Sequence, residues 1–231
     1  MSEHIVTAYD EELTKMAGKV AEMGGLAEKA FADAVSALVS QDLDLARQTI
    51  KQDERLDQLH QDVEANLIEM IVRRQPMGQD LREITAATRI ANDLERVGDL
   101  AKNVAKRVIA IDSNLQSKKL AIGVEHMTEL ALSQLTRVLD AYTRKDAEAA
   151  RQVQEADAEV DAIYTSLFRE LLTYMMEDPR VITQCVHLLF CAKNIERIGD
   201  HATNIAENVY YMVTGERLPE DRAKMDETGA T

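Results

Sequence analysis

One acidic motif occurs twice in the chain, 101 residues apart. Residues 91–103 read ANDLERVGDLAKN, and residues 192–204 read AKNIERIGDHATN. The Glu, Arg, Gly, Asp, Ala and Asn of the motif recur in register, although a repeat that served packing alone would need to match only at its apolar positions. The duplicated acidic pair therefore indicates that the repeat carries chemistry as well as packing.

The acidic residues of the motif are spaced to share one face of a helix. Glu95 and Asp99 are four residues apart, which places their side chains one turn apart on the same side of an α-helix. A further acidic pair with the same spacing precedes each copy of the motif. The predicted metal ligands are Glu95, Asp99, Glu196, Asp200, Asp157, Asp161, Asp53 and Asp57. If the helices that carry them are neighbours, each repeat gathers up to four carboxylates.

Carboxylates at this density favour a bound cation. Like charges that lie close together raise each other's pKa unless a cation intervenes. Carboxylate oxygens are preferred ligands of hard cations. The sequence therefore predicts sites for divalent or trivalent metal ions (Mg²⁺, Mn²⁺, iron or Zn²⁺) and leaves the identity of the metal open.

Two other interpretations of the motif need no metal. Acidic residues at this spacing are frequent on the solvated face of surface helices, and the chain could be a purely structural helical partner. Arg96 and Arg197 could serve as internal counter-ions in either case. Gly98 and Gly199 each cost about 1 kcal/mol of helix propensity relative to Ala. We expect these glycines to allow a close helix contact or to leave room beside an ion.

The main alternative function is a metal-dependent hydrolase or oxidase that uses the same carboxylates. Carboxylate di-iron bundles use a repeated Glu-x-x-His motif, and the nearest match, Asp57 with His60, occurs only once in the chain. The sequence contains no Gly-rich phosphate loop and no Gly-x-Ser-x-Gly elbow. These features favour a protein that is not an enzyme.

Composition narrows the class of protein further. The chain has 231 residues, of which 45% are apolar, enough to bury a core, and its net charge of −14 argues against binding to nucleic acid. It shows no signal peptide and no apolar run of the roughly 20 residues that cross a bilayer. We therefore expect a cytoplasmic protein that meets the membrane only through partners. Cys185 and Cys191 are expected to be buried, reduced thiols.

The spacing of apolar residues predicts the fold. Apolar positions step by three and four in six segments, as at Leu94, Val97 and Ala101, and corresponding segments align at offsets of 101 or 104 residues. The pattern predicts six antiparallel helices of about 30 residues, roughly 45 Å each. We expect an all-α fold of two tandem antiparallel three-helix bundles related by an internal repeat. The expected domains are residues 1–112 and 115–213, followed by a disordered tail at 214–231.

At these residues the chain resembles the PhoU family. The resemblance extends over roughly residues 5–213, and its most specific segments are residues 95–99, 196–200, 74–76 and 172–178. It implies two three-helix bundles, commonly in a homodimer. Some members of this family bind metal clusters through Glu/Asp-x-x-x-Asp motifs, which coincide here with the four acidic pairs named above.

The resemblance also implies a function. PhoU-like proteins are negative regulators of the phosphate-starvation (Pho) response and modulators of phosphate uptake by the Pst transporter. They have no established catalytic activity. The implied partners are a PstB-type transporter ATPase and a PhoR-type sensor histidine kinase, which the protein would link as a metal-binding adaptor.

Overall fold

The computed structural model describes residues 2–111 and 118–218, which form helices and short turns with no β-strand among them. The elements are α1 (Ser2–Ser40), α2 (Leu43–Arg74), α3 (Gln79–Ala110), α4 (Lys118–Arg144), α5 (Ala147–Glu155), α6 (Asp157–Glu177), the 3₁₀ turn η1 (Pro179–Val181) and α7 (Ile182–Thr214). The prediction of an all-α fold is confirmed.

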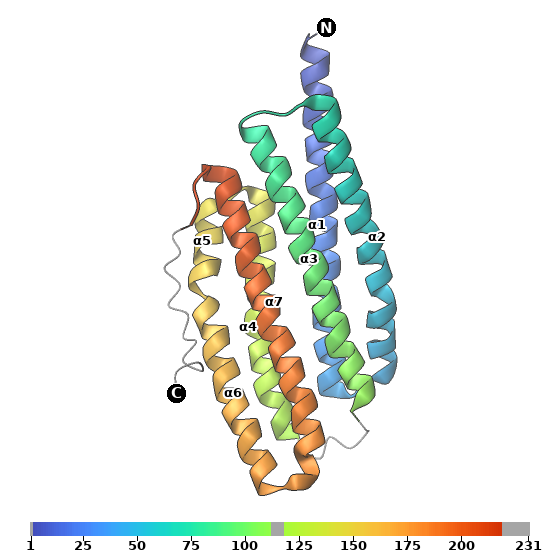
Figure 1. Ribbon diagram of the computed structural model, residues 1–231, viewed down its shortest axis with the longest axis vertical. Helices are drawn as coiled ribbons and strands as arrows, with labels where there is room; N and C mark the ends of the chain where they lie inside the picture. Colours follow the sequence, from blue (N-terminus) through green and yellow to red (C-terminus); the bar gives the residue numbers. More distant parts are fainter. Residues whose placement is uncertain (1, 112–117, 219–231) are drawn as a thin grey trace.

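The helices form two bundles that lie side by side (Figure 1). Helices α1, α2 and α3 pack together in the first bundle, and α4 to α7 in the second. Between the bundles α3 packs against α7 and α1 against α4, which leaves α2 and α6 on the outside. The predicted domain boundary at residues 112–115 lies outside the described residues, as does the predicted tail from residue 219 onward.

The internal repeat is visible in the turn that opens the second helix of each bundle. Gln41 and Lys145 both adopt positive φ angles, of 58° and 52°. Asp42 and Asp146 follow them and cap the next helix, because their carboxylates accept hydrogen bonds from backbone N–H groups of its first turn. The two bundles therefore share turn geometry as well as apolar periodicity.

One helix differs from the prediction. The expected fifth helix is interrupted at Ala156, whose N–H donates to the carbonyl of Val153 at 3.2 Å, a hydrogen bond one residue shorter than an α-helical one. The second bundle consequently contains α5 and α6 where the first bundle has the continuous α2. The break places Asp157 in the first turn of α6.

The core follows the predicted apolar stripes. Leu94, Val97 and Ala101 of α3 are fully buried, and so are their counterparts Ile195, Ile198 and Ala202 of α7. Cys185 and Cys191 are free and buried, as predicted. Within the described ranges, no helix is long and apolar enough to cross a membrane.

Candidate functional site

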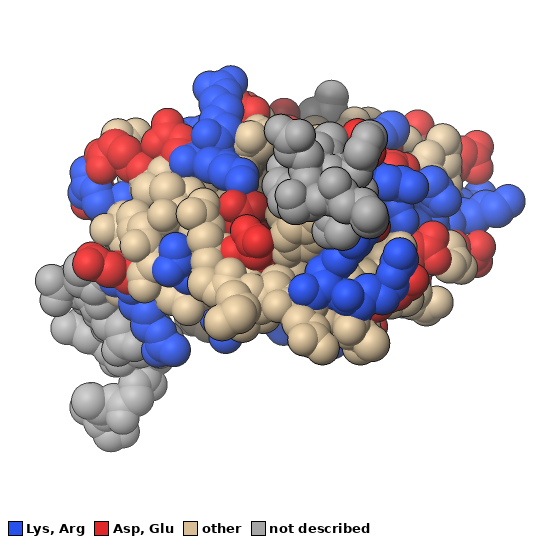
Figure 2. Space-filling view, turned by 90° about the horizontal axis from the view of Figure 1, so that it is seen from above, with Lys and Arg blue, Asp and Glu red and all other residues tan. Residues whose placement is uncertain are grey.

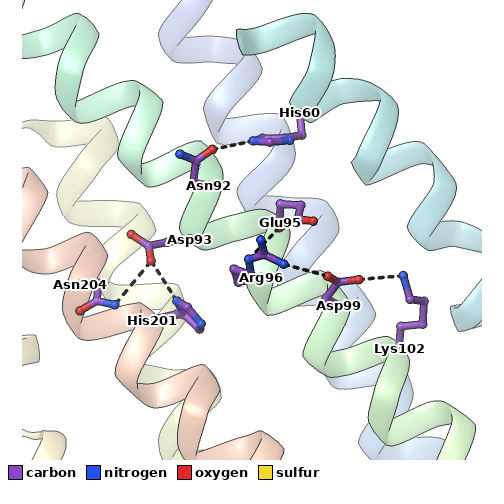
Figure 3. A network of polar contacts seen from close by, with 9 residues as sticks. All are labelled: His60, Asn92, Asp93, Glu95, Arg96, Asp99, Lys102, His201 and Asn204. Atoms are coloured by element: carbon purple, nitrogen blue, oxygen red, sulfur yellow. Dashed lines mark hydrogen bonds and ion pairs between the residues drawn. The ribbon is translucent and has the colours of Figure 1, made fainter.

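In the first bundle Glu95 and Asp99 of the acidic motif lie on the side of α3 that faces α2 (Figure 3). Arg96 lies between the two carboxylates, with its Nε 3.4 Å from Glu95 Oε2 and a terminal guanidinium nitrogen 3.4 Å from Asp99 Oδ2. These ion pairs are long, and the Arg96 side chain is 61% exposed. Arg96 therefore contributes little to neutralising the pair.

Lys102 is the principal counter-ion of this cluster. Its ammonium group donates hydrogen bonds to Asp99 Oδ1, at 2.8 Å, and to Asp53 Oδ2 on α2. The Asp53 side chain is only 6% exposed, whereas that of Lys102 is 21% exposed. The contact links α2 to α3 through a charged group that the acidic pattern alone does not indicate.

The pKa shifts of this contact follow from burial. Burial raises the pKa of the Asp53 carboxyl, and the hydrogen bond from Lys102 offsets this only in part. Burial alone would lower the pKa of Lys102, but its hydrogen bonds to Asp53 and Asp99 outweigh that effect and raise it.

The acidic pairs of α2 and α3 lie within electrostatic reach of each other. Burial raises the pKa of Glu95, and the charges of Asp99 and Asp57 raise it further. Asp57 and Glu95 are both half-buried. Near the same site His60 Nε2 is 2.8 Å from Asn92 Oδ1.

In the second bundle a lysine also pairs with the acidic motif, but the contact lies within one helix. Lys193 Nζ lies 2.7 Å from each carboxylate oxygen of Glu196, whose side chain is 13% exposed. Burial raises the pKa of Glu196, Lys193 offsets part of the shift, and the charges of Asp200 and Asp161 add to it. Asp200 is half-buried and Asp161 is exposed on α6.

The two motif glycines allow close approach of the second helix of each bundle. A Cβ atom on Gly98 would overlap the Leu56 methyl group and lie 3.4 Å from Asp53 Oδ1. A Cβ on Gly199 would lie 3.3 Å from Gln134 Oε1 and 3.9 Å from Asp157 Oδ1. The structure therefore supports a close helix contact as one role of the glycines, and room beside an ion stays a prediction.

Gln134 of α4 brings an unpaired oxygen to this space. Its side chain is buried, with 4% exposure, and its Oε1 is among the buried side-chain atoms of the described residues that have no hydrogen-bond partner. Leaving a buried carbonyl unsatisfied costs about 1–3 kcal/mol. The pattern of acidic residues does not indicate Gln134. The repeat does provide a signal, because the corresponding residue of the first bundle is Ala30.

The residues present suit a hard cation, although their arrangement is open. In the first bundle the Lys102 ammonium stands in for such an ion between two carboxylates. In the second bundle the orphaned oxygen of Gln134 adjoins the space beside Gly199 and Asp157. Among the described residues no three Asp, Glu, His or Cys side chains converge closely enough to hold a metal ion as they stand. Metal binding at the eight predicted residues therefore stays a prediction.

A polar contact that includes a residue of the acidic motif joins the two bundles (Figure 3). His201 Nδ1 of α7 lies 2.9 Å from Asp93 Oδ1 of α3, and the Asn204 amide donates to the same oxygen at 3.5 Å. Asp93 lies within the motif, yet it faces α7, whereas Glu95 and Asp99 face α2. The acidic motif thus contributes to the contact between bundles as well as to the candidate site.

The fold and the site define a class of protein: a duplicated helical bundle with an acidic cluster in each half. A protein-family model described as the PhoU domain matches residues 20–108 and 124–209. The chain therefore belongs to the PhoU family, and the resemblance noted from the sequence is confirmed.

Individual relatives agree with this assignment. The chain is 59% identical to the phosphate-specific transport system accessory protein PhoU homolog of Rhizobium meliloti, covering 97% of this chain and 95% of that protein. It is 47% identical to the homolog from Caulobacter vibrioides, covering 98% of both chains.

Solved structures give the same result. The crystal structure of PhoU from Pseudomonas aeruginosa matches with a TM-score of 0.87 and 38% identity over 90% of this chain and 100% of that chain. The phosphate transport system regulatory protein PhoU from Streptococcus pneumoniae matches with a TM-score of 0.84 and 27% identity, covering 91% and 99%. The relatives are thus named as accessory or regulatory proteins of phosphate transport, and this chain has a role in the regulation of phosphate transport.

Proposed function

We propose that this chain is a negative regulator of the phosphate-starvation response and a modulator of Pst phosphate uptake. It acts in the cytoplasm, without catalytic activity, as a metal-binding adaptor between the PstB-type ATPase and the PhoR-type sensor kinase. The observation that carries this proposal is the match over nearly the whole chain to proteins named as accessory or regulatory components of phosphate transport. The two buried cysteines agree with a non-catalytic role, because burial raises their thiol pKa values and disfavours thiolates.

An adaptor of this kind should be recovered with both partners. Tagged protein incubated with membranes from phosphate-replete cells is expected to retain the transporter ATPase and the sensor kinase. The tag alone and a helical protein of similar charge serve as controls. Retention of neither partner in phosphate-replete or phosphate-starved membranes would contradict the adaptor role.

Exposed apolar residues provide a candidate surface for self-association. Figure 2 shows Lys and Arg side chains interspersed with Asp and Glu at the end of the molecule seen from above. The α6–α7 hairpin, in contrast, exposes two apolar rows. These rows are Phe168, Leu172 and Met176 on α6 and Ile182, Val186 and Phe190 on α7.

These six residues, which we call the α6–α7 face, have the size expected for an interface. Their exposed area is on the order of 600 Å², as large as the largest apolar patches of monomeric proteins. A standard interface buries about 800 Å² per partner, and homodimer interfaces are the more apolar ones. In the first bundle the positions of Phe168 and Phe190 hold the charged residues Glu64 and Arg89, whereas Ile68, Val72 and Leu81, at the positions of Leu172, Met176 and Ile182, are also exposed. We therefore propose that the face pairs with its copy in a second chain to form a homodimer.

A matched pair of variants tests the proposed dimer. Leu172→Glu places charge in the centre of the α6–α7 face and is expected to shift the protein from dimer to monomer in light scattering. Ile68→Glu changes the corresponding exposed residue of the first bundle and is expected to leave the dimer intact. Circular dichroism checks that both variants fold. If both substitutions or neither abolish the dimer, the interface lies elsewhere.

A further inference from the structure

A cavity of about 140 Å³ lies between α1 and α2, and none of the residues that line it belongs to the acidic motif. Two of its lining residues, Met16 and Met70, are buried. The others are polar: Glu12, Lys15, Lys19, Asn66, Glu69 and Arg73. Pockets for drug-sized ligands measure roughly 300–1,000 Å³. The α1–α2 cavity is smaller and suits a small ion with a few water molecules.

Two lysines of the lining carry charge that no described residue neutralises. Among the residues that the structure describes, neither Lys15 nor Lys19 forms an ion pair. They are four residues apart on α1, so their side chains lie one turn apart on one face of the helix. Lys15 is exposed and Lys19 is half-buried. In a chain with a net charge of −14, such a pair favours an anionic ligand.

The carboxylates of the lining decide which anion fits. Glu12 accepts two hydrogen bonds from the Arg74 guanidinium, at 3.1 and 2.6 Å, and these hydrogen bonds lower its pKa. Glu69 accepts a hydrogen bond from Arg73 at 3.0 Å. Charged carboxylates accept hydrogen bonds and cannot donate them, so they repel an anion that has no proton to offer. The lining therefore favours an anion that also carries an O–H group.

The second bundle is different at the corresponding positions. The residue that matches Lys19 is Gly123, where a Cβ atom would lie 2.7 Å from Leu167 Cδ1, so α4 and α6 are in close contact there. Arg73 corresponds to Glu177, which reverses the charge. The cationic cavity is therefore a feature of the first bundle alone among these positions, and the packing of a three-helix bundle does not require it.

We propose that the α1–α2 cavity binds inorganic phosphate. At about pH 8 hydrogen phosphate combines negative charge with one O–H group, whereas sulfate has no O–H, and a phosphate monoester, with a second pKa of about 6, has lost its own. Lys15 and Lys19 donate hydrogen bonds to the charged oxygens, and Glu12 or Glu69 accepts one from the O–H group. This ligand agrees with the role of the chain in the regulation of phosphate transport. The site requires neither a metal ion nor a second chain.

Titration of the full-length protein with sodium phosphate, followed by two-dimensional NMR of the backbone amides, tests the proposal. Chelator keeps the protein free of metal, and ionic strength is held constant at about pH 8. We expect saturable shifts at the residues that line the cavity, with a Kd on the order of 1 mM because the site is small and open to solvent. Sulfate and glycerol phosphate should bind about tenfold more weakly or less, because each leaves a carboxylate without its donor.

Matched pairs of substitutions separate a site from a general effect of charge. Lys15→Gln with Lys19→Gln should weaken phosphate binding about tenfold or more. Lys51→Gln with Lys106→Gln removes the same charge from two exposed positions elsewhere and should leave the Kd unchanged. Asn66→Glu adds a carboxylate to the lining and should also weaken binding. Circular dichroism checks that each variant folds.

The outcomes are distinct from those that test the adaptor function. Absence of saturable shifts with phosphate in the parent, or equal weakening by the two lysine pairs, would overturn the proposed site. Equal affinities for phosphate and sulfate would overturn the role of the carboxylates and with it the assignment of phosphate as the ligand. None of these results would affect the proposed adaptor, which is tested by recovery of its partners.

Discussion

Cells that lack this protein are expected to express their phosphate-starvation genes in phosphate-replete medium, at the level that starved wild-type cells reach. The proposed adaptor conveys the state of the transporter to the sensor kinase, so its loss leaves the kinase without the repressing signal. A reporter for a starvation-induced phosphatase measures the effect. Reintroducing the wild-type chain should restore repression in phosphate and leave induction on starvation unchanged.

Complementation with the single-site variants shows which surface the signal requires. Leu172→Glu tests the α6–α7 face, and Ile68→Glu serves as its matched control. If the deletion strain still silences these genes in phosphate, the proposed negative regulation is wrong, whatever the metal content of the protein.

Much of the fold could be predicted because its signals are local. Asp42 and Asp146 cap their helices independently of how the bundles pack, since a capping carboxylate needs only the first turn of its own helix. Gly215, with φ of 77°, ends α7 in the left-handed conformation that glycine adopts without steric cost. The apolar stripes likewise depend on the periodicity of one helix at a time.

The features that the sequence did not predict depend on how helices face one another. Asp93 and Asp99 lie on the same helix, but Asp93 contacts His201 across the bundle interface and Asp99 contacts Lys102. Their different partners follow from the orientation of α3 between α2 and α7, which apolar periodicity does not specify. The aligned repeats did contain a signal at Lys102 and at Gln134, because the copies differ there. A comparison of the two copies that considers only their matching acidic residues does not detect such differences.

The pairs Glu95/Asp99 and Glu196/Asp200 are expected to account for stabilisation of the protein by metal. A ligand present at a hundredfold excess over its Kd stabilises the folded state by about 2.7 kcal/mol. In a chain of this size that corresponds to an increase in melting temperature of roughly 5–10 °C. The parent should show such an increase with Mn²⁺ or Mg²⁺. The quadruple variant Glu95→Gln, Asp99→Asn, Glu196→Gln and Asp200→Asn should show none.

Without metal the same variant is expected to be as stable as the parent or more stable. Glu95 and Glu196 have pKa values raised by burial, so their charged forms are less favourable in the folded than in the unfolded protein. Between the unfolded value near 4.5 and the raised folded value, the folded state binds more protons, and stability falls as pH rises. The gain from removing these charges should therefore be largest at neutral pH and vanish below about pH 4.5.

Thermal unfolding followed by circular dichroism, in chelator and in metal, measures both effects. A control variant carries the same change of net charge at four exposed glutamates, Glu54, Glu64, Glu125 and Glu159, each changed to Gln. It should keep the metal-dependent increase, because it retains every proposed ligand. If the site variant and the parent respond equally to metal, the repeated acidic pairs are a solvated helix face, and the duplication of their charges has another cause.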